Sequence, residues 1–382
     1  HSKRILLFGE FMKLLILKVF VFAIRVLYAP MKLRKTQNKI LWLSRQSNEK
    51  SSDMTTLESA INNAEPSVKQ VFRLRRLKDE SAVTLSYIFG IIGDMWHIAS
   101  AKVVIVDTYS IPVSCLKHKA GTKVVQIWHA LGAVKKFGLQ SVGKAQGRAE
   151  GVSKILCMHR NYDYVIAPSK ATADIYCQAF GCDESNIKIL SLPGVDTLLD
   201  NSNRKEEFLS LNPQYKGKKL VAYIPTFRND DDIYANSLVK AFNLQGEYAL
   251  VVSAHPLSKT AATGQYKING NFSSRDLMKL CDINITDYSA CAIEGALLNK
   301  PLYFYVPDYD IYKAEQGLNI DIKSELISAV FDSAESLVSA LGTEYDFQKL
   351  NAFSRRYVEN INTDNTERLT SFICSLLKGE LL

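Results

Sequence analysis

Two histidines and a serine follow apolar runs of this chain, at points where buried strands would end. His129 follows the run 124–128, His255 comes two residues after the run 249–253, and Ser289 comes shortly after Thr286. The carboxyl ends of parallel strands meet at one edge of an α/β sheet, where such folds bind ligands. An imidazole can take a proton from a hydroxyl or donate a hydrogen bond to a phosphate. These residues predict acid–base chemistry on a phosphorylated nucleotide; histidines that serve only structure are the alternative.

A hydroxyl-rich turn that begins at Thr286 has the pattern of a helix start. Thr286, Ser289 and the backbone N–H groups of residues 289–291 would form a phosphate cup there, because helix N-termini attract anions. Glu294, about one helical turn further on, could accept hydrogen bonds from ribose hydroxyls. Asp287 is expected to cap the helix or to support the other residues, and simple capping is compatible with a ligand.

Four further residues extend the predicted site. Thr226 and Arg228 follow the first apolar run of the second half of the chain, and a guanidinium can bind two phosphate oxygens at once. Lys135 and Lys136 lie one or two turns beyond the first histidine and suit an anionic acceptor. The alternative for Arg228 and the two lysines is an ordinary solvated side chain.

The composition narrows the class of protein. The chain has 382 residues, 47% of them hydrophobic, and a formal net charge of +8 that is concentrated in the first half. Such a charge suits a membrane surface, a phosphorylated acceptor or nucleic acid, unless it is only a solvated surface. The sequence contains no Walker A motif, no GxGxxG and no carboxylate cluster with metal-binding spacing. We therefore expect no P-loop, no dinucleotide fingerprint and no metal site.

Residues 5–29 are strongly apolar but carry four charges, at Glu10, Lys13, Lys18 and Arg25. On a helical wheel with about 100° per residue, the four fall within about 140° of arc. A one-sided charged stripe is typical of a helix that lies in the membrane interface, and the basic run that follows would meet anionic head groups. A helix packed on the protein's own core and a signal anchor remain alternatives.

Short apolar runs that alternate with helical patterns indicate parallel α/β sheets. The expected strands are 39–44, 71–74, 102–107, 123–128, 164–169 and 187–192, followed by 220–224, 249–253, 283–286 and 302–306. The polar stretch 200–219 is expected to be a linker. We predict two doubly wound, Rossmann-like domains that face each other across a cleft, as in the GT-B plan. The ranges are 1–36 for the amphipathic membrane helix and its basic flank, 37–200 for an acceptor-binding domain, 201–360 for a nucleotide-binding domain, and 361–382 for a helix that crosses back to the first domain.

Four ordered blocks resemble the motifs of the CDP-glycerol glycerophosphotransferases, the TagB/TagF-type enzymes of teichoic acid synthesis in Gram-positive bacteria. The blocks are QIWHALG with KKFG at 126–138, YIPTFR at 223–228, SAHP at 253–256, and TDYS at 286–289 with Glu294 and NKPLYFY at 299–305. Ala130, Ala290 and Glu294 stand where the family usually has Gly, Ser and Asp. These departures leave the donor polyol, glycerol or ribitol, open.

The resemblance implies a metal-independent phosphotransferase without a cofactor. It would move glycerol phosphate from CDP-glycerol to a hydroxyl of an undecaprenyl-diphosphate-linked disaccharide and release CMP. By the resemblance, His129 would be the base, Glu294 would contact ribose or glycerol hydroxyls, and the pyrophosphate would be held by His255, Arg228, Thr226 and Ser289. The compact chain is more similar to a primase than to a polymerase of the family. It would work as a peripheral protein on the cytoplasmic face of the membrane. No nucleic-acid partner is expected.

Other functions remain open from the sequence. A polyol-phosphate polymerase and a CDP-ribitol-dependent ribitolphosphotransferase are the nearest alternatives. A GT-B glycosyltransferase with a nucleotide-sugar donor, and a non-catalytic module that binds membranes or nucleic acid through the basic half-chain, are the more distant ones. The two strand-end histidines and the phosphate cup favour an enzyme, since electrostatic binding needs neither.

Overall fold

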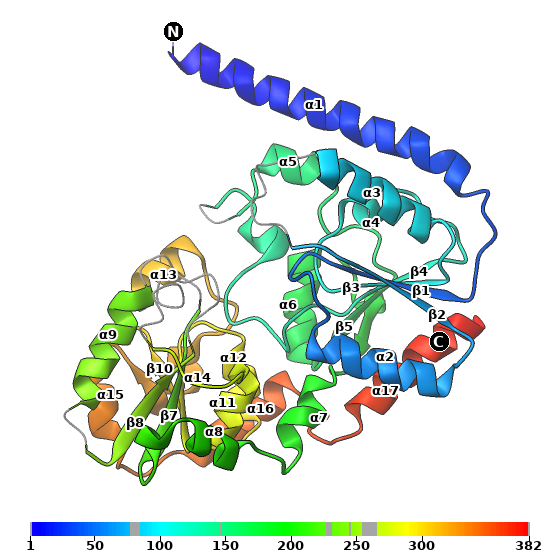
Figure 1. The fold of residues 1–382 in the computed structure, drawn as a ribbon. Helices are drawn as coiled ribbons and strands as arrows, with labels where there is room; N and C mark the ends of the chain where they lie inside the picture. The colour runs from blue at the N-terminus through cyan, green and yellow to red at the C-terminus, as the bar shows by residue number, and fades with distance from the viewer. Residues whose placement is uncertain are drawn as a thin grey trace. The chain divides into compact units, whose positions relative to one another are not determined.

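The computed structural model describes residues 2–76, 85–144, 147–226, 231–243, 246–253 and 266–380. By its contacts the chain forms two units, and each contains one parallel sheet with helices around it (Figure 1). The first unit comprises residues 1–129, 137–194 and 364–382, and the second comprises 130–136 and 195–363. The short segment 130–136 thus groups with the second unit, whereas the predicted range 37–200 included it.

The first sheet has the strand order β2-β1-β3-β4-β5-β6, and every neighbouring pair is parallel. Its strands are β1 (Lys39–Ser44), β2 (Lys69–Leu74), β3 (Val103–Val106), β4 (Lys123–Gln126), β5 (Tyr164–Ala167) and β6 (Ile187–Ile189). All six predicted strands are present. β1 and β3 are buried at every position, which explains why their sequences are almost continuously apolar.

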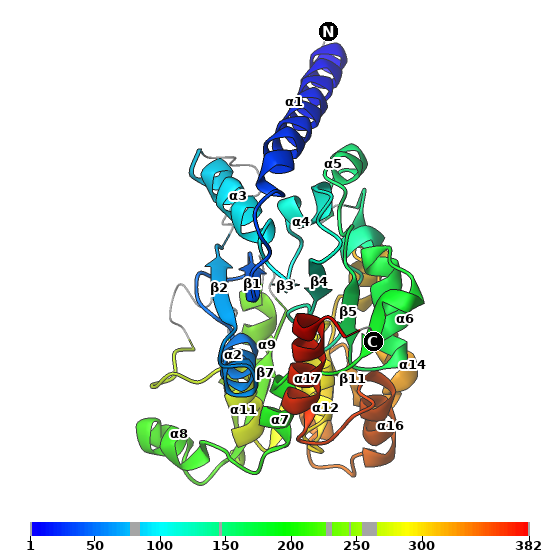
Figure 2. The same cartoon turned by 90° about the vertical axis from the view of Figure 1, so that its right-hand side faces the viewer.

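Helices from opposite ends of the sequence cover one face of this sheet. α17 (Asn365–Lys378) lies beside α2 (Ser52–Ala64), as Figure 2 shows. Leu369 and Ile373 of α17 share a core cluster with Leu57 of α2. The other face is covered by α3 (Leu85–Ile98), α4 (Ile111–Cys115), α5 (Glu150–Ile155) and α6 (Lys170–Phe180).

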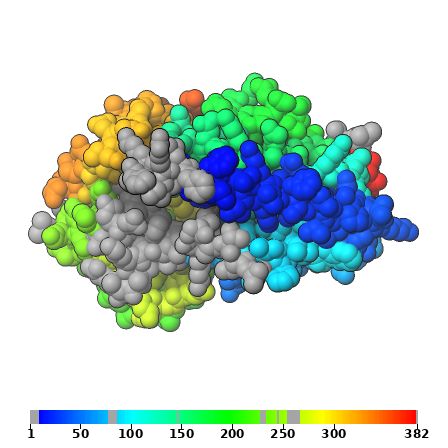
Figure 3. Space-filling view, turned by 90° about the horizontal axis from the view of Figure 1, so that it is seen from above, coloured from blue at the N-terminus to red at the C-terminus, as the bar shows by residue number. Residues whose placement is uncertain are grey.

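α1 (Ser2–Met31) packs on the first unit with one side only. Val21, Ile24 and Tyr28 join the core cluster beside α3 and α4. On the helical wheel these residues fall within the arc of the four charges, so this arc faces the protein although the four charged side chains are themselves exposed. The opposite side exposes Phe11, Met12, Leu15, Ile16, Val19, Phe22, Val26 and Leu27. Figure 3 shows this helix, in blue, on the molecular surface.

The buried side of α1 agrees with the predicted core-packed helix, whereas the predicted interfacial helix stays a prediction that needs the exposed apolar side. The segment Gly9–Met31 has a mean hydropathy of 2.0 and is long enough to cross a membrane. Core helices and signal sequences meet the same length and composition criteria. Only the exposed apolar side distinguishes α1 from an ordinary core helix.

The second sheet has the strand order β11-β10-β9-β7-β8, again with parallel pairs throughout. Its strands are β7 (Lys219–Ile224), β8 (Tyr248–Val252), β9 (Ile283–Thr286), β10 (Leu302–Tyr305) and β11 (Val330–Phe331). The four predicted strands are present, but β11 was not predicted, because two residues are too short to show a period. The main helices are α9 (Asp231–Phe242), α11 (Ser274–Leu280), α12 (Cys291–Ala296), α13 (Tyr309–Glu315), α15 (Ala334–Ala340) and α16 (Phe347–Tyr357).

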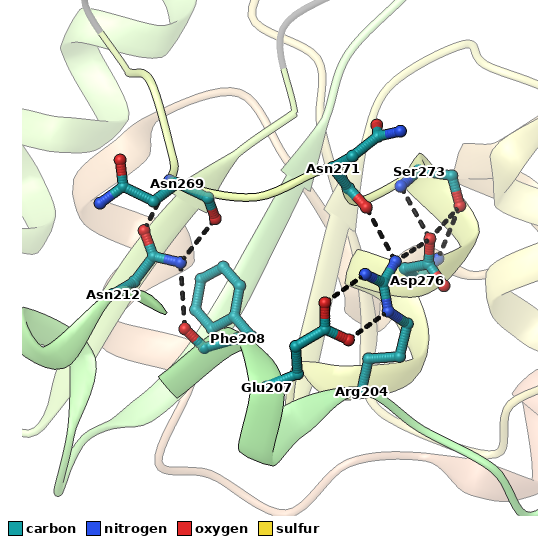
Figure 4. Close-up of polar contacts among 8 residues, drawn as sticks. All are labelled: Arg204, Glu207, Phe208, Asn212, Asn269, Asn271, Ser273 and Asp276. Carbon is teal, nitrogen blue, oxygen red and sulfur yellow. Dashed lines mark hydrogen bonds and ion pairs between the residues drawn. The ribbon is translucent and has the colours of Figure 1, made fainter. Parts of the chain in front are cut away.

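The stretch 200–219, expected to be a linker, instead contains α8 (Lys205–Leu211). Phe208 of this helix is completely buried in the core of the second unit. Polar contacts hold both ends of α8: Arg204 contacts Glu207, Asp276 and the Asn271 carbonyl, and Asn212 contacts Asn269 (Figure 4). One buried aromatic residue among polar neighbours gives too weak a periodic signal to predict such a helix.

The one-sided packing of α1 makes a first prediction. Ile24→Ala should lower the free energy of unfolding of the first unit by about 2–4 kcal/mol, because it leaves a cavity in the core. Leu27→Ala, which removes a similar volume from the exposed side, should change it by about 0.5 kcal/mol or less. Urea unfolding followed by tryptophan fluorescence measures this, since all three tryptophans lie in the first unit. Equal destabilisation by both variants would contradict the described packing.

Candidate active site

In each sheet the chain first adds one strand beside its first strand, β1 or β7, and then crosses over to add the remaining strands on the other side. The place where this change of direction occurs is the topological switch point of the sheet. In the first sheet it lies between β1 and β3, and there Ser44 Oγ donates to Asp107 Oδ2 at 2.9 Å. In the second sheet it lies between β7 and β9, and there Thr226 Oγ1 donates to Asp287 Oδ1 at 2.7 Å. Open α/β sheets bind ligands at these points.

His129 lies just beyond the carboxyl end of β4, next to the first switch point. Two residues after the strand, Trp128 turns the chain with a φ of 55°, and the Trp128 N–H donates to Gln126 Oε1 at 2.8 Å. The exposed His129 ring lies against the indole of Trp128, with centroids 4.1 Å apart. This turn therefore presents the imidazole at the sheet edge, where the sequence predicted it.

The hydrogen bonds of His129 define its tautomer. Nδ1 lies 3.0 Å from the backbone oxygen of Asp107, which can only accept, so Nδ1 carries the proton. In the neutral ring Nε2 then has the lone pair, and Gln46 Nε2, which lies 3.1 Å from Nδ1 and 3.2 Å from Nε2, can donate only to Nε2. A histidine held in this way can accept a proton at Nε2. Gln46 was not among the predicted residues, since no feature of its local sequence marks it.

Asp107 connects His129 to the switch point. Its backbone oxygen accepts from the imidazole, and its carboxylate accepts from Ser44. The second carboxylate oxygen, Oδ1, is buried and has no hydrogen-bond partner within the described part of the chain. Burial raises the pKa of this carboxyl from 3.8 to about 6, although the hydrogen bond from Ser44 opposes the shift. From the sequence, Asp107 was expected only to be the last residue of a strand.

At the second switch point, Asp287 organises the ends of two strands. Its Oδ1 accepts from Thr226 Oγ1 at 2.7 Å, from the Thr226 N–H at 2.8 Å and from the Ser289 N–H at 3.2 Å. The hydroxyl of Thr286 donates to the Ile224 carbonyl at 2.8 Å. Both threonine hydroxyls thus give their hydrogens to protein partners. In this arrangement they cannot also donate to a phosphate, so the structure favours a supporting role for both.

The predicted phosphate cup is only partly open in this conformation. The Ser289 N–H is bound to Asp287, and the Cys291 N–H donates to Ser289 Oγ at 3.3 Å. Within the described residues, the N–H of Ala290 has no such partner. The half-buried hydroxyl of Ser289 can still donate its own hydrogen, because it accepts from Cys291. The cup is thus reduced to one hydroxyl and one amide.

Glu294 faces a partner that the sequence did not indicate. Its Oε1 accepts from Arg275 Nη2 at 2.7 Å and from Arg275 Nε at 3.2 Å. Glu294 is buried, and Arg275 lies in the first turn of α11, whose start is capped by Ser273. The guanidinium and the carboxylate therefore lie together at one place, and Arg275 joins the candidate residues. An isolated Arg in a short helix offers no pattern from which to predict this.

The spacing of Lys135 and Lys136 from His129 had suggested that they lie on a helix, but they do not. Lys135 forms an antiparallel bridge with Leu318, and the Lys136 N–H donates to the Gly317 carbonyl at 3.0 Å. Asn319 Nδ2 donates to the Lys135 carbonyl at 3.0 Å. The two lysines are thus held by backbone contacts within the second unit, and their side chains are half-buried.

His255 and Arg228 lie outside the described residues, so their predicted roles stay predictions. Within the described ranges, no group of three or more His, Cys, Asp or Glu side chains is placed to hold a metal ion. Each unit therefore has its own described candidate residues: His129 with Gln46 in the first unit, and Ser289 with the Arg275–Glu294 pair in the second.

Comparison with known proteins defines first the class and then the family. The wall teichoic acid polymerase TagF superposes with a TM-score of 0.71 at 18% identity, over 97% of this chain and 98% of that chain. A co-structure of S. aureus MnaA with UDP gives 0.58 at 14% identity, over 90% and 98%. At these identities the two structures show the fold alone, which is GT-B-like.

Residues 26–375 match the family described as CDP-Glycerol:Poly(glycerophosphate) glycerophosphotransferase. A teichoic acid ribitol-phosphate primase of Bacillus spizizenii is 29% identical over 82% of this chain and 85% of its own length. A teichoic acid glycerol-phosphate primase of Bacillus subtilis is 30% identical over 73% of this chain and 74% of its own length. The chain therefore belongs to this glycerophosphotransferase family, as the sequence motifs predicted.

The buried carboxyl of Asp107 predicts a pH dependence. A pKa raised on folding means that the folded state holds a proton which the unfolded state has lost, so stability from this group falls as pH rises from about 4 to about 6. The fall is up to ~3 kcal/mol. Asp107→Asn should flatten the stability profile over this window, and Ser44→Ala, which removes the opposing donor, should steepen it. Fluorescence-monitored urea unfolding between pH 4 and 7 tests this; parallel profiles would show that Asp107 is not the cause.

The bond between β7 and β9 gives a third prediction. Thr226→Val keeps the side-chain shape but removes the donor to Asp287, and should reduce stability by about 1 kcal/mol. Thr226→Ser keeps the donor and serves as the matched control. Hydrogen exchange of the β7 and β9 amides measures the effect within the second unit. If the valine variant exchanged no faster than the serine variant, the hydrogen bond would not hold the strand ends.

Proposed function

We propose that this chain is a teichoic acid primase that transfers glycerol phosphate from CDP-glycerol to a hydroxyl of an undecaprenyl-diphosphate-linked disaccharide, with release of CMP. The observation that carries the proposal is His129, which the Asp107 carbonyl holds as the Nδ1–H tautomer beyond a strand end, so that Nε2 is the nitrogen that accepts a proton. Family membership and the primases among the relatives support it. In addition, a TagF variant has been soaked with CDPG.

In the proposed reaction, His129 Nε2 takes the proton of the acceptor hydroxyl as its oxygen attacks the phosphorus that bears the glycerol. A new phosphate ester bond forms, the bond to the bridging oxygen of the diphosphate breaks, and the electron pair leaves with CMP. The Asp107 carbonyl keeps the imidazole in the required tautomer and stabilises the imidazolium that forms. General-base catalysis of this kind contributes about 10²–10⁴-fold to the rate.

The second unit is proposed to hold the donor. His255 and Arg228 would neutralise the diphosphate, and Ser289 with the Ala290 N–H would contact a phosphate oxygen. Glu294 would accept from ribose or glycerol hydroxyls with its position set by Arg275. No metal ion or cofactor is included in the proposal. Thr226 and Thr286 would act by shaping the loops rather than by direct donation.

The acceptor and the membrane form a further part of the proposal. Lys135 and Lys136, whose backbone is tied to residues 317–319, would contact the anionic acceptor with their ammonium groups. The exposed apolar side of α1 would lie among the lipid acyl chains and keep the protein on the cytoplasmic face of the membrane. The anionic membrane surface would thus be a partner of this chain.

One alternative has direct support. The two primases described above, one for ribitol phosphate and one for glycerol phosphate, are similar to this chain at 29% and 30% identity. A CDP-ribitol-dependent primase is therefore the second candidate. Polymerases are also among the relatives, for example a poly(ribitol-phosphate) polymerase at 27% identity over 47% of its own length.

A donor assay tests the proposal. The protein is incubated with CDP-glycerol or CDP-ribitol and a short prenyl-diphosphate disaccharide, and the products are weighed by mass spectrometry. We expect one glycerol phosphate per acceptor and release of CMP. His129→Ala and His255→Ala should each lower kcat by at least ~10²-fold, because each removes a group that acts in the transition state.

His97→Ala is the control and should retain activity, because this histidine lies on α3, in the helical layer of the first unit. Transfer from CDP-ribitol alone would move the assignment to the second candidate. Full activity in both the His129 and His255 variants would refute the mechanism.

A further inference from the structure

The first unit contains a cavity of about 680 Å³ at the amino edge of its sheet, beside the last turns of α1. Lys123 at the start of β4 lines it, whereas His129 follows the other end of the same strand. The strand between them is roughly 10 Å long, and His129 lies beyond its far end. The cavity is therefore separate from the site of His129.

The cavity is strongly cationic. Six basic residues line it and only one carboxylate, Asp163, opposes them; the basic residues are Arg25, Lys32, Lys117, Lys119, Lys123 and Arg160. Lys123 pairs loosely with that carboxylate at 3.8 Å. The side chains of Lys32, Lys117 and Arg160 make no hydrogen bond or ion pair within the described ranges. A cavity with this excess of unpaired positive charge attracts an anion.

The wall of the cavity is built from neutral polar groups that hold its loop in place. His118 Nε2 donates to the Val113 carbonyl at 2.8 Å, so Nδ1 accepts from the Tyr28 hydroxyl at 3.2 Å. Asn161 Nδ2 lies within 3.1 Å of three carbonyls of residues 113–116. Because these groups are satisfied, the loop that carries Lys117 and Lys119 is fixed before any ligand arrives.

The position of the cavity beside α1 indicates where its anion comes from. Arg25 of α1 and Lys32, the first residue after it, line the cavity, and the other side of this helix exposes Phe22, Val26 and Leu27. Leu33, next to Lys32, is 88% exposed. Apolar side chains on the outer side and cations directly beneath match the order of acyl chains and phosphates in a lipid leaflet.

We propose that this cavity binds the phosphate head group of an anionic glycerophospholipid such as phosphatidylglycerol. The inference rests on the membrane association proposed for α1. The lipid phosphate is held by Lys32, Lys117 and Arg160, while its acyl chains lie along the exposed side of the helix. The site is thus a specific lipid-binding site in addition to general attraction by surface charge.

Cys157 lines the cavity and reports on its occupancy, while the half-buried Cys177 on α6 is an internal control. The full-length protein is alkylated with a maleimide, and the rate at each cysteine is read by mass spectrometry. One set of samples contains vesicles of phosphatidylcholine with or without phosphatidylglycerol. Two others contain monomeric dihexanoyl phosphatidylglycerol or inorganic phosphate. We expect the glycerol lipid, in both forms, to slow labelling of Cys157 at least about threefold relative to Cys177.

Two matched variants each remove three positive charges. Lys32→Ser/Lys117→Ser/Arg160→Ser should abolish the protection of Cys157, whereas Lys13→Ser/Lys18→Ser/Lys35→Ser should retain it; circular dichroism checks that both fold. The proposal would be overturned if the lipid left the labelling rate of Cys157 unchanged. It would also be overturned if both variants lost the protection of Cys157 equally. Equal protection by inorganic phosphate would overturn the lipid as its source. Protection by the monomeric lipid without binding to vesicles would support the cavity and instead refute the proposed membrane association of α1.

Discussion

Each half of the molecule depends on one hydroxyl–carboxylate hydrogen bond at its topological switch point. Parallel strands diverge there, and the two loops that leave them are held together by side-chain hydrogen bonds rather than by the ladder of the sheet. Ser44 with Asp107 and Thr226 with Asp287 close that gap in the two units. Both aspartates are buried, so each bond lies in a medium of low polarity where it is stronger than in water.

The same two aspartates also position the residues assigned to the chemistry. The main chain of Asp107 sets the tautomer of His129, and the carboxylate of Asp287 binds the amide of Ser289. In each unit the group that joins the strands is thus also the group that orients a candidate residue. The active-site geometry depends on the sheet through these contacts, and the left-handed turn at Trp128 is stabilised by the side chain of Gln126 in a similar way.

Much of the architecture could be predicted from the sequence because buried parallel strands are marked by apolar composition. All ten predicted strands are present, and the motifs around His129 and Ser289 identified the family. Features that depend on contacts between distant residues could not be predicted. Arg275 lies beside Glu294 only after the strands pair, and α8 is a helix because of what covers Phe208. The wheel showed that α1 has two sides, but only packing shows which of them faces the protein.

The place of α17 in the first unit constrains how the chain can fold during synthesis. The layer that α2 and α17 form on the first sheet is completed by Leu369, Phe372 and Ile373, so one face of strands made from residue 39 onward stays partly uncovered until residues 365–378 emerge. All strands and helices of the second unit lie before residue 364 and are therefore synthesised before α17. We therefore infer that the later-encoded half matures first on the ribosome, and that the earlier-encoded half is the one that needs protection from aggregation while it waits.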